Sequence, residues 1–305
     1  MRSGENIRPR IAHKQAGTRM NFPPAPFVVG VARSGTTLLR LMLDAHPALA
    51  IPSETHFLTP LIKRSPNTKE AFLKTVTGAQ TWENMALESA DLRAALDRLN
   101  TFSLADAVRC FYRLYADRFG KARWGDKTGN YLNVMTPLRA LLPEAHFIHI
   151  IRDGRDNALS FQGLWFGPGN DFADLAQFWV GRITAARQQA QRLPHYLEVR
   201  YEALVTEPER VLREICDYIA LPFDPAMLAH HDAAGSRLSE YTRPFGRQGT
   251  PTDIGQFREI YARAATPPDP ARIGRWRSEM PLAEQRRFEA VAGPLLRELG
   301  YETVF

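Results

Sequence analysis

The chain has 305 residues, of which 44% are hydrophobic and 24% charged, which excludes a fibrous or wholly disordered protein. Its 39 basic and 33 acidic residues give a net charge of +6, so an anionic partner is expected. Five basic residues between Met1 and Arg19 stand against Glu5 alone, which leaves the rest of the chain nearly neutral and argues against a nucleic-acid-binding surface. We expect residues 1–22 to be a flexible basic arm and residues 23–305 to form one domain.

The cysteine content and the hydropathy of the chain indicate the cellular compartment in which we expect the protein. The two cysteines, Cys110 and Cys216, support neither a disulfide framework nor a metal cluster, so we expect a reducing, cytoplasmic compartment and no metal. No segment approaches the roughly 18 to 20 apolar residues of a membrane span, and the amino terminus lacks the apolar run of a secretory signal. We therefore expect no membrane insertion.

Short apolar runs alternate with helical segments along the chain. Strands are predicted at Phe27–Val31, Ala48–Ile51, Ala145–Ile151 and Leu197–Tyr201, and a helix at Leu38–Ala45. The run Ala145–Ile151 is apolar enough to be buried on both faces of a sheet. This alternation predicts an α/β fold, a P-loop-like parallel β-sheet flanked by helices, with functional groups at the carboxyl ends of the strands.

The remaining segments are predicted to be mainly helical. Helices are expected at Leu87–Leu99, at Ser103–Phe119 with an apolar stripe facing the core, and at Leu282–Leu299 with a kink or break at Pro294. Thr206 and Glu209 suggest a capping box for a helix that reaches about Ala220, with Pro208 in its first turn. Residues 235–255 are rich in turn formers and are interpreted as an insertion or lid on the substrate side of the single domain.

The segment from Gly30 to Thr37 has the spacing of a phosphate-binding loop, G-x-x-x-x-G-x-[ST], between a predicted strand and a predicted helix. Its glycines allow a tight turn, and the N–H groups at the helix start meet an anion together with the positive end of the helix dipole. Thr36 stands where a nucleoside-triphosphate enzyme has lysine, and no Mg²⁺-holding acid is evident. The loop suits a smaller, less charged anhydride, with Arg33 supplying positive charge.

These residues resemble those of a known family. VGVARSGTTLLRLMLDAHP followed by PSETHF resembles the 5′-phosphosulfate loop of sulfotransferases that use 3′-phosphoadenosine 5′-phosphosulfate (PAPS), especially the branch of tyrosylprotein enzymes and bacterial members. FIHIIRDGRDNALSF is similar to the family's second signature, in which Arg152 and Ser160 match the pair that holds the 3′-phosphate. Residues 124–128, 201–204 and 272–277 resemble three further family segments. The resemblance implies PAPS as co-substrate, held by Arg33, Ser34, Gly35, Thr36, Thr37, Arg152, Ser160, Tyr201, Arg275 and Arg277.

The chemistry of the 3′-phosphate agrees with the implied pair. A phosphate with up to two charges favours a bidentate arginine and a hydroxyl donor, which Arg152 and Ser160 can offer together. The alternative for Arg152 is a strand-end ion pair with Asp153 or Asp156. Arg155 and Asp156 can pair with each other in the turn and are assigned no role.

Sulfuryl transfer to a hydroxyl needs an aligned acceptor, a base, and a positive group at the bridging oxygen. The resemblance implies Glu54 as the base, and burial beside the substrate would raise its pKa toward the working range. His56 is the rival base, and a capping or rim carboxylate is the other interpretation of Glu54. Lys127, with Arg33, is the candidate for stabilising the bridging oxygen; a surface pair with Asp126 is its alternative.

Two other functions stay open at this point. A P-loop nucleotide or small-molecule kinase is opposed by the missing Gly-Lys pair, and a non-catalytic nucleotide- or nucleic-acid-binding protein would use the basic arm. Likeness to the tyrosylprotein branch suggests peptide tyrosine, but the missing anchor and few cysteines favour a small-molecule, lipid or carbohydrate hydroxyl. The acceptor should be selected by residues 55–123 and 235–265.

Overall fold

The computed structural model describes residues 22–164, 167–240, 242 and 261–305. Residues 1–21 of the predicted basic arm, and residues 241 and 243–255 of the predicted lid, lie outside this range. Phe22, the last residue of the predicted arm, packs beneath Arg109, whose guanidinium carbon lies 3.9 Å from the ring centroid. Phe22 is therefore in contact with the folded domain.

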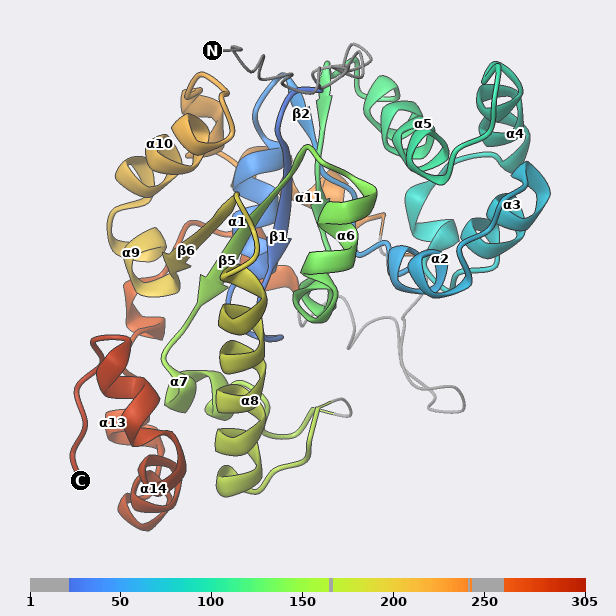
Figure 1. Cartoon of the computed structure of the whole chain (residues 1–305). Coiled ribbons are helices and arrows are strands. Elements are labelled where there is room, and N and C mark those ends of the chain that lie inside the picture. The colour runs from blue at the N-terminus through green and yellow to red at the C-terminus, as the bar shows by residue number, and fades with distance from the viewer. Residues whose placement is uncertain (1–21, 165–166, 241, 243–260) are drawn as a thin grey trace, which may run out of the picture.

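A parallel sheet of four strands forms the centre of the protein, as the alternation of strands and helices predicted (Figure 1). In spatial order the strands are β4 (Asp126–Lys127), β1 (Ala25–Val29), β5 (Ala145–Ile151) and β6 (Tyr196–Arg200). In this register Phe27 lies between Asp126 and Phe147. Every residue of β1 and β5 is buried, as expected for parallel strands whose two faces are both covered by helices.

The order in which the chain adds strands to the sheet reverses between β1 and β5. After β1 it continues to β4 on one side, and after β5 it continues to β6 on the other. The connections that follow the carboxyl ends of β1 and β5 therefore run in opposite directions. Parallel α/β proteins bind ligands in the crevice that such a divergence opens. The loop after β1 and Arg152 after β5 both lie at this crevice.

The strand predicted at Ala48–Ile51 forms but does not join the central sheet. It is β2 (Leu49–Ala50), and it pairs with β3 (Arg123–Trp124) in a separate sheet of two parallel strands. The place beside β1 is taken by β4, which follows β3 after Gly125. A side chain on Gly125 would lie 2.7 Å from the carbonyl oxygen of Pro26, so a glycine permits the close approach of the two strands.

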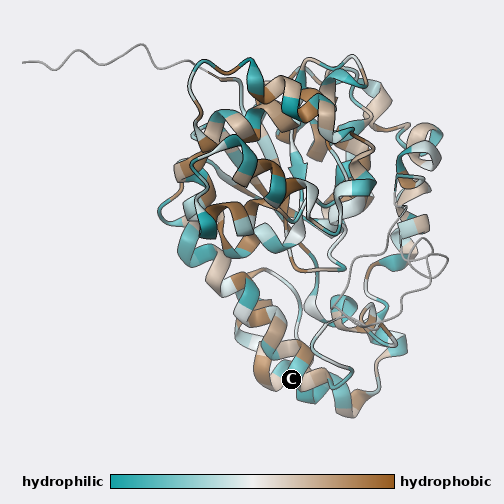
Figure 2. Cartoon of the chain, turned by 90° about the vertical axis from the view of Figure 1, so that its right-hand side faces the viewer, coloured by the Kyte–Doolittle hydropathy of each residue, from teal (hydrophilic) through white to brown (hydrophobic). Residues whose placement is uncertain are grey.

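Between β2 and β3 the chain forms a helical insertion, seen on the right of Figure 1. Its helices are α2 (Leu58–Arg64), α3 (Lys69–Thr77), η1 (Trp82–Met85), α4 (Ser89–Asp97) and α5 (Leu104–Asp117). Helix α5 begins at Ser103, whose hydroxyl accepts from the Asp106 N–H at 3.1 Å. In its predicted apolar stripe Val108, Phe111, Tyr112 and Tyr115 are fully buried, and Leu104 in the first turn is partly buried. Figure 2 shows how each helix carries both polar and apolar residues around the apolar strands.

The other helices flank the central sheet or pack on the helices beside it. They are α1 (Thr36–Asp44), η2 (Gly129–Asn133), α6 (Met135–Leu141), α7 (Gly154–Leu159), α8 (Phe172–Ala190), α9 (Tyr201–Thr206), α10 (Pro208–Tyr218), η3 (Pro225–Met227), α11 (His231–Leu238), η4 (Arg263–Ala265), η5 (Pro270–Arg272), α13 (Trp276–Glu279) and α14 (Leu282–Glu298). Helix α14, for example, packs on α8. Residues 235–238, the first part of the predicted lid, form the end of α11. None of the helices in the described residues is long and apolar enough to cross a membrane.

Two details of the predicted helices need correction: the capping box is wrong, and of the predicted kink or break at Pro294 the break is excluded. The Thr206 hydroxyl does not cap α10; it donates to the Glu202 carbonyl at 2.9 Å, within the preceding helix α9. Helix α14 continues through Pro294 without a break. The turn after this proline is held because Leu295 and Leu296 are buried in the core that α14 shares with α8.

Candidate active site

The loop between β1 and α1 turns sharply at two residues. Arg33 has φ of 70° and Gly35 has φ of 95°, both in the left-handed region. A side chain on Gly35 would lie 2.5 Å from the Tyr201 ring, so only glycine fits this position without displacing the ring. Among the described residues no side chain caps the start of α1, and Thr36 and Thr37 line a cavity there. The positive end of α1 is therefore open to an anion.

Arg152, directly after β5, lies beside this loop at the same cavity. Its Nη1 lies 3.2 Å from the Ser160 hydroxyl and 3.3 Å from the Arg33 carbonyl, and its Nη2 donates to the Arg272 carbonyl at 2.8 Å. The guanidinium lies over the Tyr201 ring, 4.6 Å from its centroid. Arg152 Nε is buried and has no hydrogen-bond partner among the described residues. The arginine thus has unused capacity to bind an anion.

The alternative partners of Arg152 are engaged elsewhere. Its contact with the Asp156 carboxylate is long, at 4.0 Å, because Asp156 accepts from the N–H groups of Gly274 at 2.7 Å and Trp276 at 2.9 Å. The predicted pairing of Arg155 with Asp156 is wrong, since Arg155 is fully buried and contacts Asp153 at 2.7 Å and Glu289 at 2.6 Å. Asp156 fixes the segment that directly follows η5, and this holds Arg272, the last residue of η5, at the cavity.

The structure places the arginines of the 272–277 segment in different surroundings. Arg272 lines the cavity, whereas Arg275 and Arg277 are not among its lining residues. Arg275 pairs with Glu279 along α13, with Nε 2.6 Å from Oε1, and Arg277 pairs with Glu302 at 2.7 Å. The turn at Gly274, with φ of 72°, separates Arg272 from the other two.

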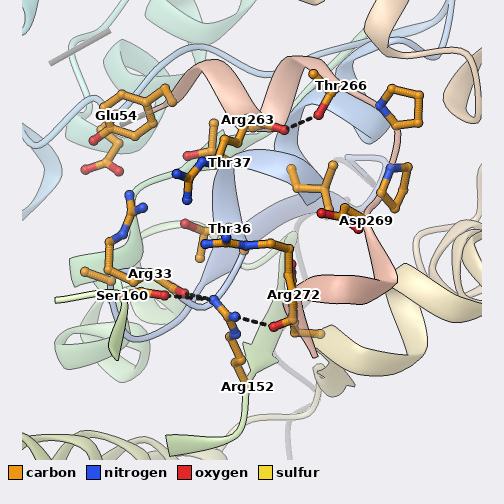
Figure 3. Close-up of a pocket in the computed structure, with 18 residues that line it drawn as sticks. Arg33, Thr36, Thr37, Glu54, Arg152, Ser160, Arg263, Thr266, Asp269 and Arg272 are labelled. Carbon is orange, nitrogen blue, oxygen red and sulfur yellow. Dashed lines mark hydrogen bonds between the residues drawn. The ribbon is translucent and has the colours of Figure 1, made fainter. Parts of the chain in front are cut away.

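Figure 3 shows the guanidinium groups of Arg33, Arg152, Arg263 and Arg272 around one cavity of about 200 Å³. Burial, together with repulsion from the other three arginines, lowers the pKa of Arg33 against the attraction of Tyr261. Burial and neighbouring arginines also lower the pKa of Arg272. Such concentrated positive charge is unfavourable in the empty cavity and favourable once an anion binds.

Glu54 and Lys127 meet at the edge of the same cavity. Lys127, at the end of β4, is fully buried, and its Nζ donates to Glu54 Oε1 at 2.8 Å. His56 Nε2 lies 2.9 Å from Glu54 Oε2. Glu54 lines the cavity, and Lys127 lies behind it. A surface pair of Asp126 with Lys127 is excluded because both residues are fully buried and Asp126 accepts hydrogen bonds from Thr55 and Tyr112.

The pKa of Glu54 is shifted in the opposite direction from the prediction. Burial alone would raise it, but the Lys127 ammonium and the neighbouring His56 lower the pKa of Glu54 to about 2. The expectation failed because it considered burial and not the cation that the fold places beside the carboxylate. Glu54 is therefore ionised in the free protein.

Residues 24–225 match the family model described as "Sulfotransferase family". The chain belongs to the sulfotransferase family. It is therefore an enzyme, as predicted.

Relatives of this sulfotransferase cover almost all of its length. It is 27% identical over 314 residues to protein-tyrosine sulfotransferase 1 of Danio rerio, covering 99% of this chain and 77% of the relative. It is 29% identical over 310 residues to nodulation protein NoeE of Sinorhizobium fredii, covering 92% and 67%.

Two solved structures share the fold of the sulfotransferase. The sulfotransferase domain from the curacin biosynthetic pathway has a TM-score of 0.56 at 22% identity, covering 92% of this chain and 99% of that domain. The sulfotransferase domain from the Synechococcus PCC 7002 olefin synthase has a TM-score of 0.55 at 25% identity, covering 95% and 99%.

The structure adds three observations on polar residues of the sulfotransferase's site. Ser34, predicted to contact the cofactor, is buried outside the cavity lining, and its hydroxyl lies 3.1 Å from Asn157 Nδ2. The same Asn157 amide donates to the Ala32 carbonyl at 2.9 Å and so braces the loop. Neither Asn157 nor the cavity residue Arg263 carried a signal in the sequence, because each acts on a segment more than one hundred residues away.

In the part of the chain that the structure describes, no group of three His, Cys, Asp or Glu side chains is arranged to hold a metal ion.

Proposed function

We propose that this sulfotransferase moves the sulfuryl group of PAPS to a hydroxyl group of a small-molecule, lipid or carbohydrate acceptor. One observation carries the proposal: two sets of anion-binding groups face one cavity from adjacent strand ends. Arg33, Thr36 and Thr37 form the first set, and Arg152, Ser160 and Arg272 form the second. PAPS carries two separate anionic groups, a 5′-phosphosulfate and a 3′-phosphate, which suit these two sets.

The nucleotide would be held by the residues around this cavity. The start of α1 and Arg33 would bind the 5′-phosphosulfate, because the open N–H groups and the guanidinium favour its negative charge. Arg152 and Ser160 would bind the 3′-phosphate, and Arg272 in place of Arg275 and Arg277 would supply the second guanidinium. Tyr201 supports both parts of the site, since it contacts Gly35 and lies beneath Arg152.

The chemical step would use the pair at the cavity edge. Glu54 takes the proton of the acceptor hydroxyl as the acceptor oxygen bonds to sulfur, and the bond from sulfur to the bridging oxygen breaks. Lys127 donates to that bridging oxygen and neutralises the charge that develops on PAP. When Lys127 turns from Glu54 toward the bridging oxygen, the carboxylate loses its cation and becomes a stronger base.

His56 remains the alternative base, and its position supports a secondary role. Its ring contacts the outer oxygen of Glu54 at 2.9 Å, and its backbone has φ of 56° in the left-handed region. The residue thus lies beside the base that we propose and lines no part of the cavity.

A tyrosine-containing peptide is the second candidate acceptor. A relative named protein-tyrosine sulfotransferase aligns with 99% of this chain. NoeE, at 29% identity over 92% of this chain, has a name that states no acceptor. Incubation with ³⁵S-labelled PAPS, host metabolite fractions and tyrosine peptides, with identification of the labelled product, decides between them. Absence of PAP binding in calorimetry would contradict the whole proposal, and transfer of the γ-phosphate of ATP with Mg²⁺ would indicate a kinase.

We also propose that residues 23–305 form the catalytic domain and act in the cytoplasm. The free thiols of Cys110 and Cys216 support a reducing compartment. Removal of residues 1–19 should leave turnover intact. A salt-dependent loss of affinity for nucleic acid on this truncation would instead favour a binding function of the arm.

A further inference from the structure

Directly behind the Glu54–Lys127 pair, a second set of contacts joins the same two segments. The Thr55 hydroxyl donates to Asp126 Oδ2 at 2.8 Å, and the Thr55 N–H donates to the Thr128 hydroxyl oxygen at 3.0 Å. Thr55, Asp126 and Thr128 are all fully buried. Three contacts therefore join the segment after β2 to the successive residues Asp126, Lys127 and Thr128. The Glu54–Lys127 pair is one of these contacts.

The hydroxyl groups in this region form a chain with one possible direction. Because Thr55 donates its only hydroxyl proton to Asp126, the Tyr131 hydroxyl 2.8 Å away must donate to Thr55. Tyr131 in turn accepts from the Leu58 N–H at 3.0 Å. The Tyr112 hydroxyl from α5 also donates to Asp126 Oδ2, at 2.8 Å. Asp126 is thus the final acceptor for groups from α5, η2 and the segment after β2.

Burial of the Asp126 carboxyl group at this position is unfavourable for the free energy of folding. Its Oδ1 has no hydrogen-bond partner among the described residues. Burial raises the pKa of Asp126 to about 6, although hydrogen bonds from Thr55, Tyr112 and Thr128 and the attraction of His56 favour the charged form. A carboxyl group with a free oxygen in the interior costs stability, so its position beside Lys127 calls for a role other than packing.

We propose that Thr55 and Asp126 are positioning residues, which set the distance and orientation between the carboxylate of Glu54 and the ammonium of Lys127. The inference rests on the proposed function. Thr55 lies between Glu54 and His56, and Asp126 immediately precedes Lys127, so the bond between Thr55 and Asp126 ties the backbone of the base to the backbone of the cation. A displacement of about 1 Å between reacting groups can cost on the order of 100-fold in rate.

The test is Thr55→Val, which removes the hydroxyl and keeps the branched shape. We expect kcat for PAP release from PAPS, with the acceptor fraction found by ³⁵S labelling, to fall about 10- to 100-fold. The Kd for PAP in calorimetry should stay within about twofold of the wild type, because Thr55 does not line the cavity. Thr55→Ser retains the hydroxyl and should recover kcat to within about threefold.

A matched control separates positioning from general loss of a buried bond. The Thr75 hydroxyl in α3 donates to the Ala71 carbonyl at 2.9 Å, and Thr75→Val makes the same substitution at a residue that does not line the cavity. We expect its kcat to be unchanged. Asp126→Asn is the second variant: it keeps an acceptor oxygen, removes the charge, and should also lower kcat at least 10-fold with the Kd for PAP retained.

The outcomes distinguish this inference from the proposed function. Wild-type kcat in both Thr55→Val and Asp126→Asn, or an equal loss of kcat and PAP affinity, would overturn the positioning role. Failure of Thr55→Ser to recover activity would do the same. A wild-type protein that binds no PAP and consumes no PAPS would instead overturn the proposed function.

Discussion

Glu54 Oε1 lies 2.8 Å from Lys127 Nζ, although the two residues are 73 positions apart in the chain. The side chains that we propose as base and as stabiliser of the bridging oxygen therefore neutralise one another in the free protein. Under the proposed mechanism, each of the two side chains exchanges this partner when both substrates bind.

Replacement of Lys127 tests whether this residue stabilises the bridging oxygen and contributes little to nucleotide binding. In Lys127→Ala we expect kcat to fall about 100- to 1,000-fold, because the charge on the bridging oxygen is no longer neutralised. The Kd for PAP should change less than about threefold, as Lys127 lies behind the cavity lining. Kinetics with PAPS and calorimetry with PAP measure the two effects. Lys69→Ala, which removes an exposed pair with Asp97, is the control and should change neither. Equal loss of kcat and affinity would contradict the assignment.

The low pKa of Glu54 predicts a dependence of stability on pH. A carboxyl group whose pKa is about 2 when folded and 4.5 when unfolded stabilises the protein above pH 4.5, and this contribution is lost as pH falls toward 2. Between pH 7 and pH 3 the loss is on the order of 2 kcal/mol. Glu54→Gln should show a smaller decrease in unfolding free energy over this range, measured by urea denaturation. Identical decreases in both proteins would show that Glu54 does not carry the effect.

Arg152 can be tested with two nucleotides that differ in one phosphate. Arg152→Lys loses the planar fork that the 3′-phosphate favours, so PAP binding should weaken about 10- to 100-fold. Binding of AMP, which has no 3′-phosphate, should change less than about threefold. Arg277→Lys retains the charge of a residue that pairs with Glu302 outside the cavity lining and should leave both affinities unchanged. Similar weakening for PAP and AMP would argue against a 3′-phosphate contact.

Gly35 and Gly181 provide a matched pair of alanine substitutions. Gly35→Ala places a methyl group against the Tyr201 ring at a φ of 95°, so we expect PAP binding to be lost and the melting temperature to fall. Gly181 lies within α8 with no atom near its added carbon, and Gly181→Ala should stabilise the protein by about 0.5–1 kcal/mol. Thermal unfolding and calorimetry give both results. Wild-type PAP affinity in Gly35→Ala would show that the loop can adapt.

The carboxyl-terminal helix contributes a buried ion pair that should matter for stability and not for catalysis. Glu289 contacts Arg155 at 2.6 Å and accepts from the N–H groups of Val304 and Phe305. Glu289→Ala leaves Arg155 partly uncompensated and should lower the unfolding free energy by about 3–5 kcal/mol. Glu284→Ala removes an exposed pair on the same helix and should cost less than about 1 kcal/mol. Both proteins should retain kcat per folded molecule; a loss in Glu289→Ala would contradict a purely structural role.

The spacing of residues along the chain was sufficient to predict the main features of the fold. The loop from Gly30 to Thr37, the buried strand Ala145–Ile151 and the placement of Arg152 beside Ser160 all depend on residues that lie close together in sequence. Local geometry limits such segments to few conformations, so the residue pattern alone indicates both the strand–loop–helix unit and the anion that it suits.

Contacts between distant segments decided the rest. The pKa of Glu54 depends on the neighbouring Lys127. The strand beside β1 is β4, whereas β2 pairs with β3 in a second sheet that was not expected. Arg272 lines the cavity because Asp156, 118 positions from Gly274, holds the turn after it. Electrostatic shifts and strand neighbours depend on distances in space, and these are known only once the tertiary structure brings the segments together.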